Sequence, residues 1–227
     1  MCGRISQEPS ARELARLFQA ELLPDDKPEL GARYNVAPTQ PVLAVVEDEG
    51  KRRIVQHRWG LIPSWAKDPA MFGARTINAR AETVAVKPSY RDSFRRRRSL
   101  VPANAFYEWR RKDGSRQPYA IVRRDGKPLA IAGLWSTWRD PGSDRELLTC
   151  AVITTEANEV VGELHDRMPV ILPEDAWDLW LDPRRQDAAE LEKLLRPCPS
   201  ELIRAYPVSR AVGNTRNDGP ELLREVA

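Results

Sequence analysis

The second residue of the chain, Cys2, could become its first, because a small residue after the initiator usually allows Met1 to be removed. The free α-amine would titrate near about pH 8 and the thiol near about 8.5, so a minority of each is nucleophilic at neutral pH. Together they can condense with an aldehyde, first to a Schiff base and then to a five-membered thiazolidine. Taken alone, Cys2 would be interpreted as a chance residue at a frayed terminus.

Three polar residues, Asn78, Arg80 and Glu82, alternate with two alanines, so an extended segment would present all three to one face. An amide, a guanidinium and a carboxylate directed together are typical of a site. The same pattern fits an exposed strand face, or a loop whose charges are merely solvated, and the pattern alone favours neither a site nor these alternatives.

Glu108 stands between aromatic residues in Phe106-Tyr107-Glu108-Trp109, inside a segment otherwise suited to burial. A buried carboxylate must be paired or have a raised pKa, which suits general acid and base catalysis. Alternatively Glu108 faces outward in an alternating strand. We favour the functional interpretation.

His165 falls in His165-Asp166-Arg167-Met168-Pro169, where a helix is expected to end just before a strand. Histidine transfers protons at physiological pH, and a helix end would hold it in a fixed geometry. A lone histidine is more often a capping or core residue. The other histidine, His57, lies in a charged strand and is interpreted as structural.

Two kinds of residue could contact a ligand. Trp59 and Trp65 flank a Gly/Pro loop, where an exposed aromatic could stack on an unpaired base; core packing is the expectation for Trp59. The run from Arg95 to Arg98 could contact phosphates or simply be a solvated loop. Cys150 is expected to be a small buried residue and Cys198 a loop thiol.

Composition bounds these possibilities. The chain has 227 residues, 41% hydrophobic and 30% charged, and no apolar run long enough to span a membrane, so we expect a soluble cytoplasmic protein. Three cysteines without zinc-site spacing fit a reducing compartment and no metal site. The net charge is only +3, although 29 of the 36 Lys and Arg residues are Arg, so total charge does not establish a nucleic-acid partner.

The pattern along the chain predicts a mixture of tight hairpins and short helices. Ser10 and Glu13 form a capping box that opens a helix over 11–22. Strands are predicted at 42–47, 53–58, 106–110, 119–123, 129–134, 147–154 and 168–172, with turns at 48–50, 112–114 and 125–127. Further helices are predicted at about 156–164, from Pro173, and at 188–195.

Strands joined mostly by tight turns, with helices inserted rather than alternating, indicate an α+β fold on a curved, largely antiparallel, barrel-like sheet. No Gly/Ser or Pro linker divides the chain. We therefore expect a single domain over 1–227, with an irregular tail after about residue 215.

Taken in order, the motifs resemble those of the SOS-response-associated peptidase (SRAP) family, and the resemblance covers nearly the whole chain. Its pieces are Met1-Cys2-Gly3-Arg4, Tyr34-Asn35-Val36-Ala37-Pro38, Trp59-Gly60-Leu61-Ile62-Pro63-Ser64-Trp65, Asn78-Ala79-Arg80-Ala81-Glu82, Phe106-Tyr107-Glu108-Trp109, Ile153-Thr154-Thr155-Glu156-Ala157-Asn158, His165-Asp166-Arg167-Met168-Pro169 and Val208-Ser209-Arg210-Ala211-Val212-Gly213-Asn214.

The resemblance implies a positively charged channel with the processed cysteine at its floor, and reaction with abasic sites in single-stranded DNA. The family's catalytic residues fall on Cys2, Asn78, Glu108 and His165. Its DNA contacts fall on Arg4, Arg80 and Trp65. It also implies self-catalysed removal of Met1 in some members, and lyase activity. The stretch from Val84 to Arg98 is least typical, and no contacts are transferred into it.

The hypothesis is that Cys2 forms a thiazolidine crosslink with the ring-opened sugar of an abasic site and so shields the lesion. The protein would act as a monomer on single-stranded DNA, without a metal or organic cofactor. The alternative is an N-terminal-nucleophile amidohydrolase, such as a glutamine amidotransferase that uses Cys2. A DNA-binding module without chemistry is the third possibility.

Overall fold

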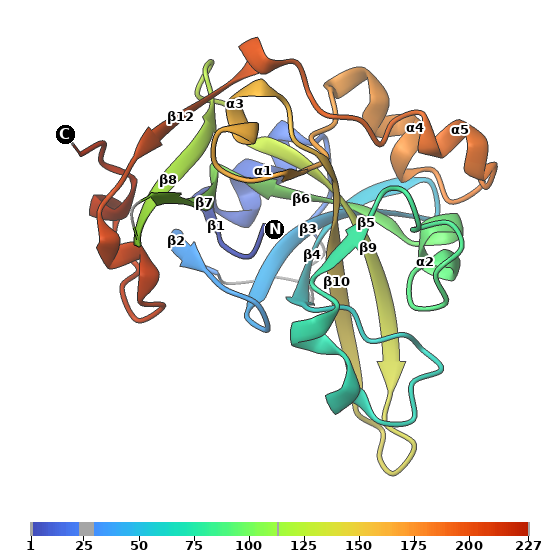
Figure 1. The fold of residues 1–227 in the computed structure, drawn as a ribbon. Coiled ribbons are helices and arrows are strands. Elements are labelled where there is room, and N and C mark those ends of the chain that lie inside the picture. The colour runs from blue at the N-terminus through green and yellow to red at the C-terminus, as the bar shows by residue number, and fades with distance from the viewer. Residues whose placement is uncertain (1, 23–29, 113, 227) are drawn as a thin grey trace.

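Five strands close into a ring in the computed structural model, which describes residues 2–22, 30–112 and 114–226 (Figure 1). The ring follows the order β10 (Glu146–Glu156), β4 (Lys51–Trp59), β3 (Pro41–Asp48), β6 (Arg98–Ala103), β9 (Leu129–Arg139) and back to β10. Only the β10–β4 pairing in this ring is parallel. The α+β, barrel-like fold class predicted from the hairpin pattern is confirmed.

A second sheet of five antiparallel strands packs beside the barrel. Its order is β12 (Ile203–Pro207), β8 (Ser115–Arg123), β7 (Ala105–Lys112), β1 (Ile5–Gln7) and β2 (Arg33–Val36). The predicted hairpins β3–β4 and β7–β8 are confirmed. In the first of these, Glu49 and Gly50 both have positive φ, as a two-residue hairpin turn requires.

One predicted hairpin is wrong. The segment 119–123 does not pair with 129–134, because β8 lies between β7 and β12 while β9 pairs with β6 and β10. The turn at 125–127 instead carries the chain from the five-stranded sheet into the barrel. Turn residues establish that the chain reverses, whereas the partner of each strand is decided by longer-range packing.

The helices are shorter than their sequence patterns predict. The helix expected over 11–22 is α1 (Ala11–Leu17): Ser10 and Glu13 form the capping box, and Gln19 with φ 51° lies just beyond its end. The remaining α-helices are α2 (Arg91–Arg96), α3 (Glu159–Gly162), α4 (Trp177–Leu181) and α5 (Ala188–Glu192). The 3-10 turns are η1 (Pro69–Met71), η2 (Gly73–Arg75), η3 (Glu174–Ala176), η4 (Ser200–Leu202), η5 (Arg210–Gly213) and η6 (Pro220–Leu223).

Two large apolar clusters hold these layers together. One joins α1, α2 and α4 to the barrel, with Phe18 stacked on Trp177 at 4.5 Å between ring centroids. The other joins the barrel to the five-stranded sheet and contains Cys2, Trp59 and Phe106. The expectation that Trp59 is a core residue is confirmed. The start of the chain is therefore an interior segment in this fold.

Strand β10 continues beyond the ring and collects two short strands on opposite edges. The strand β5 (Asn78–Arg80) pairs with it in parallel, Arg80 opposite Thr154, and β11 (Arg167–Pro169) pairs antiparallel, Pro169 opposite Thr154. These two strands carry or adjoin three of the predicted site residues, Asn78, Arg80 and His165. Among the described residues, no helix is long and apolar enough to cross a membrane.

Candidate active site around Cys2

The pairing of β1 with β7 brings the start of the chain to Glu108. Ile5 lies opposite Phe106, and the Tyr107 amide donates to the Arg4 carbonyl at 2.9 Å. Continuing this antiparallel register by two residues places Gly3 opposite Glu108. Cys2 is fully buried, so the frayed-terminus interpretation of this residue is wrong.

The Cys2 thiol and the Glu108 carboxyl influence each other electrostatically in this interior. Burial raises the pKa of the Cys2 thiol, and the Glu108 charge raises it further. Burial also raises the pKa of Glu108, which is 4% exposed, against the opposing effect of His165. The buried interpretation of Glu108 is thus the correct one, and its raised pKa favours proton transfer nearer neutrality than an ordinary glutamate allows.

Asn78 holds the Cys2 backbone from the other side. Its Nδ2 donates to the Cys2 carbonyl at 2.8 Å, while its buried Oδ1 has no hydrogen-bond partner among the residues described here. The Tyr90 hydroxyl in turn donates to the Asn78 carbonyl at 3.0 Å. One side of the Asn78 amide is therefore committed to positioning Cys2, and the other is free to accept a proton donor.

His165 lies between the end of α3 and the start of β11, as predicted. Its Nδ1 lies 2.9 Å from the Arg167 amide, which donates to it, and 2.7 Å from the Asp166 carboxylate. These two contacts need different protonation states: a bare Nδ1 accepts from Arg167, and a protonated Nδ1 donates to Asp166. When Nδ1 accepts from Arg167 in the neutral ring, the proton is on Nε2.

Glu82 does not share a face with Asn78 and Arg80, contrary to the expectation. Strand β5 ends at Arg80, and Glu82 lies in the turns that follow. Its carboxylate binds the Arg167 guanidinium through contacts of 2.5 and 3.0 Å, and Arg167 also donates to the Thr154 carbonyl at 2.7 Å. The pair thus ties the segment after β5 to β11, across the end of β10.

The three predicted DNA contacts occupy different environments. Arg80 is exposed on β5. The Arg4 guanidinium is half-buried, and its Nη1 donates to Asn35 Oδ1 at 2.7 Å and to the Val212 carbonyl at 2.6 Å. Trp65 is 53% exposed and meets Phe72 edge-to-face at 5.6 Å. Of the three, Arg80 and Trp65 present their side chains to solvent.

The arginine run from Arg95 to Arg98 contains both exposed and buried side chains. Arg95 and Arg96 are exposed at the end of α2. Arg98 is 2% exposed and donates to backbone carbonyls at the ends of α2 and α4 and in the loop after α4. Both expectations, phosphate contact and solvated loop, are therefore wrong for Arg98, because cationic donors also satisfy helix C-terminal carbonyls.

Among the described residues, the other two cysteines form no disulfide and belong to no metal-binding cluster. Cys150 is buried in the barrel, as expected, and Cys198 lies in a loop but is only 5% exposed. All three cysteines are free thiols. Within the described part of the chain, no three His, Cys, Asp or Glu side chains come together as a metal site.

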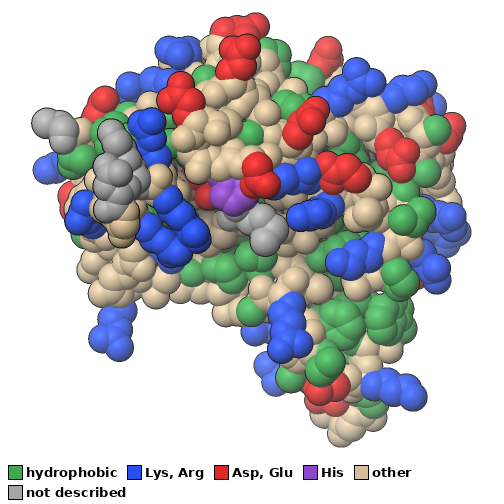
Figure 2. All heavy atoms as spheres, viewed as in Figure 1, with side chains coloured by type: hydrophobic (Ala, Val, Ile, Leu, Met, Phe, Trp, Pro, Cys, Tyr) green, Lys and Arg blue, Asp and Glu red, His purple; other side chains and the backbone are tan. Residues whose placement is uncertain are grey.

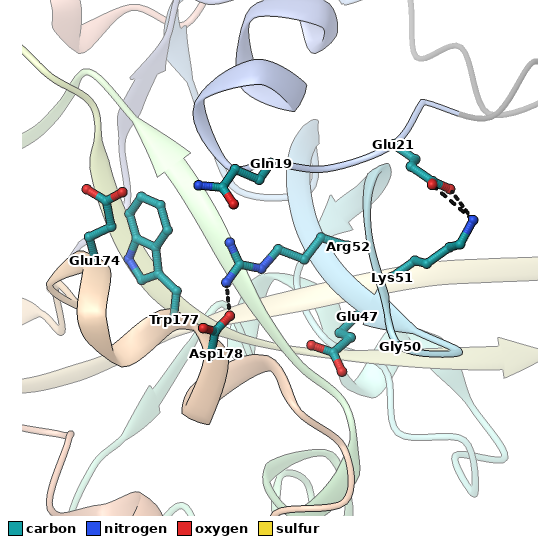
Figure 3. Close-up of a pocket in the computed structure, with 9 residues that line it drawn as sticks. All are labelled: Gln19, Glu21, Glu47, Gly50, Lys51, Arg52, Glu174, Trp177 and Asp178. Carbon is teal, nitrogen blue, oxygen red and sulfur yellow. Dashed lines mark hydrogen bonds and ion pairs between the residues drawn. The ribbon is translucent and has the colours of Figure 1, made fainter.

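Of two cavities, one is lined by a predicted site residue and the other is not. A groove of about 410 Å³ opens beside His165, and its lining consists of Trp109, Arg110, Arg111, Glu163, Leu164 and His165. A cavity of about 470 Å³ lies between α1, the β3–β4 hairpin and η3–α4 (Figure 3). Its lining includes four carboxylates and two cations, which pair as Arg52 with Asp178 and Lys51 with Glu21. It contains none of the predicted site residues and is unsuited to an anion.

Sequence reasoning missed the residues that hold the site. Tyr90 lies in the stretch from which no contacts were transferred, and no periodic signal distinguishes it there. The sequence identifies Arg167 only as one residue of a motif. In the structure its guanidinium binds the Glu82 carboxylate and its backbone amide donates to His165 Nδ1. Arg110 and Arg111 directly follow the motif Phe106-Tyr107-Glu108-Trp109 and lie within β7, and two consecutive cations next to this motif are the signal in the sequence.

The fold and this arrangement define an α+β barrel protein with an interior cysteine site at the start of the chain. The model of the family "SOS response associated peptidase (SRAP)" matches residues 1–215, and the chain belongs to this family.

Similar relatives match this chain over nearly the full length of both sequences. The chain is 40% identical over 225 residues to abasic site processing protein YoqW of Bacillus subtilis, covering 98% of this chain and 99% of that one. It is 31% identical to abasic site processing protein YedK of Escherichia coli, covering 100% of both. A solved structure of a protein from Bacteroides thetaiotaomicron superposes with a TM-score of 0.90 at 26% identity, covering 100% of both chains.

Proposed function

We propose that the protein captures abasic sites in single-stranded DNA as a covalent thiazolidine formed by Cys2 after removal of Met1. The observation that carries the proposal is the placement of Cys2: it is buried, held through its carbonyl by Asn78, and under the electrostatic influence of Glu108. The substrate class is inferred from the names of the relatives, which are abasic site processing proteins.

In the first step, the Cys2 amine attacks C1′ of the ring-opened sugar aldehyde. Glu108 takes a proton from the nitrogen and gives one to the departing hydroxyl, so that water leaves and an imine forms. The raised pKa of Glu108 supports both roles. The Asn78 Oδ1, which has no partner among the described residues, would accept a hydrogen bond from the amine and orient it.

In the second step, the Cys2 sulfur adds to the imine carbon and the thiol proton passes to the nitrogen, closing the ring. The high thiol pKa keeps the sulfur protonated until the imine has formed, which supports attack by the amine first. His165, whose charge acts on Glu108, would assist sugar-ring opening or hydrogen-bond the neighbouring phosphate. Arg80, Arg4 and Trp65 would contact the flanking strand.

Removal of Met1 is a precondition of this chemistry, because an acylated nitrogen cannot form the imine. Self-catalysed removal, lyase activity on the captured sugar and slow reversal of the adduct belong to the same proposal. Proton transfer by Glu108 and His165 would serve each of these steps.

The test combines the purified protein with an oligonucleotide containing one abasic site, followed by a denaturing gel. A shifted band is expected with the native chain and with Cys150→Ala, which removes a second buried thiol from the same apolar cluster. No band is expected with Cys2→Ala. Cys2→Ser should retain an imine that borohydride traps, while the heat-stable product is lost.

Three results would count against the proposal. No shifted band at stoichiometric protein would exclude crosslinking. Ammonia release from glutamine without a DNA adduct would favour the amidohydrolase. Mass spectrometry that found Met1 retained on crosslinking-competent protein would exclude the amine as nucleophile.

A further inference from the structure

The β7–β8 hairpin carries three exposed arginines that have no side-chain partner among the residues described. Arg110, Arg111 and Arg116 make no side-chain hydrogen bond and no ion pair with any residue that the structure describes. Arg111 lies directly opposite Arg116 in the ladder. Like charges in directly opposed positions of a sheet destabilise it, so this pair costs stability in the isolated protein.

The other two hairpins are built differently. In β3–β4, Arg53 binds Asp48 at 2.6 Å, and at the base of the β9–β10 turn Arg139 pairs with Glu146. In each of these two hairpins one arginine therefore pairs with a carboxylate on the partner strand. In β7–β8 the only carboxylate on the strands is Glu108, which is buried; Asp113 in the turn lies outside the described residues. The uncompensated charge is a distinctive property of this hairpin.

The hairpin leads out of the site. Glu108 and Arg110 share a face of β7 because side chains two apart point the same way, about 7 Å along the strand, whereas Arg111 and its cross-strand partner Arg116 belong to the opposite face of the hairpin. Arg110 and Arg111 line the groove that opens beside His165. In Figure 2, Lys and Arg side chains lie on the surface on either side of a histidine, with Asp and Glu side chains directly beside it. A ligand chain that extends from the interior site past Glu108 would therefore meet these cations.

We propose that Arg110, Arg111 and Arg116 form a phosphate-binding surface for the DNA backbone on one side of the abasic nucleotide. The inference rests on the proposed function for its choice of DNA as the polyanion. Guanidinium forks match phosphate oxygens, and a bound phosphodiester would supply the counter-charge that Arg111 and Arg116 lack. The contacts read no base, so binding through the hairpin is independent of sequence.

The test measures non-covalent binding, so that it does not depend on crosslinking. A Cys2→Ala chain is titrated with a fluorescent single strand that has no abasic site, at several salt concentrations. The combined change Arg111→Gln and Arg116→Gln should lower the slope of log K against log salt by about 1.4, or about 0.7 for each phosphate contact. The matched control, Arg12→Gln with Arg16→Gln, removes two exposed charges from α1 and should leave the slope unchanged.

A second readout excludes a merely structural role. Relief of the Arg111–Arg116 repulsion should keep or raise the melting temperature of the hairpin variant, while its DNA affinity falls. With the native Cys2 and abasic oligonucleotides trimmed from each end, the half-saturating concentration should differ between the variant and the parent only while the strand extends on one particular side. The crosslink yield at saturation should be unchanged.

An unchanged salt slope, or an equal fall in the α1 control, would overturn the inference. Hairpin-dependent binding without any crosslink would leave the inference standing and refute the proposed function. Crosslinking by a protein whose salt slope does not change when Arg111 and Arg116 are replaced would support the proposed function and refute the inference.

Discussion

At the scale of single residues, burial decides what the candidate groups can do. Cys2 and Glu108 could each be interpreted from sequence as exposed and incidental, and both are buried in the structure. Their residue types and motifs were enough to select them. The direction of the pKa shift at Glu108 also followed from its apolar neighbours. The hydrogen bond from Asn78 to the Cys2 carbonyl could not be predicted, because it joins residues 76 positions apart.

Replacement of Glu108 should slow capture without removing the nucleophile. We expect Glu108→Gln to reduce the crosslinking rate about 10²- to 10⁴-fold, as for loss of a general acid and base. Because burial raises the Glu108 pKa, the native rate should decline with falling pH at a higher pH than an ordinary glutamate would give. Time courses from pH 4.5 to 8 measure both effects. Glu201→Gln, on the surface, should leave rate and profile unchanged.

His57 predicts acid sensitivity of the fold. Burial lowers its pKa from 6.5 to about 4, and its Nδ1 has no hydrogen-bond partner among the described residues. The unfolded chain binds this proton first, so the stability contributed by His57 is lost as pH falls from about 6.5 to 4, by roughly 3 kcal/mol. Urea unfolding at pH 7.5 and 4.5 should show a smaller acid loss for His57→Gln than for the native chain. Equal losses would contradict the assignment.

At the scale of elements, local signals predicted hairpins, and tertiary contacts decided their partners. The turn at 48–50 gave β3–β4 correctly because the turn and its pairing are adjacent in sequence. The turn at 125–127 did not give a hairpin, because both edges of β9 are taken by β6 and β10. Helix α1 ends before Phe18 although Phe18 is buried, because Gln19 adopts a positive φ that interrupts the helix.

The loop that carries Trp65 depends on a close backbone crossing. Gly60 has φ +136°, and a Cβ built on it would lie 2.7 Å from the Gly73 carbonyl oxygen. Gly60→Ala should therefore destabilise the fold by about 1–3 kcal/mol. Gly31→Ala is the control, since no atom lies within 4 Å of its Cβ. Urea unfolding of the two variants compares them, and equal midpoints would show that the crossing relaxes freely.

At the scale of the whole molecule, the chain's two ends are joined beside the site. Asn35 is 1% exposed; its Oδ1 accepts from Arg4, and its Nδ2 donates to the carbonyls of Val212, Asn214 and Asn217. Three of the motifs that carry the resemblance, at 1–4, 34–38 and 208–214, thus form one network. Their order in the chain was visible from sequence, and their mutual contacts were not.

Removal of this junction should loosen both ends at once. We expect Asn35→Ala to cost about 3 kcal/mol, since it leaves several buried polar groups unpaired. Asn214→Ala, at an exposed position whose carbonyl meets Asn35 and whose side chain accepts from the Arg216 amide at 3.1 Å, should cost only about 0.5–1 kcal/mol. Denaturant unfolding measures the difference. A similar cost for both variants would show that the Asn35 side chain is dispensable.

The long strand β10 has a consequence for how this chain can change in length. Asn78 and Arg80 are registered on one edge of it and the segment after His165 on the other, with Thr154 facing both. Loss of one residue before Thr154 would shift the partner positions by about 3.3 Å and invert every side chain between them. We therefore expect insertions and deletions to be tolerated in the turn from Asp140 to Arg145 and not between Cys150 and Glu156, where the spacing fixes the register of both edges.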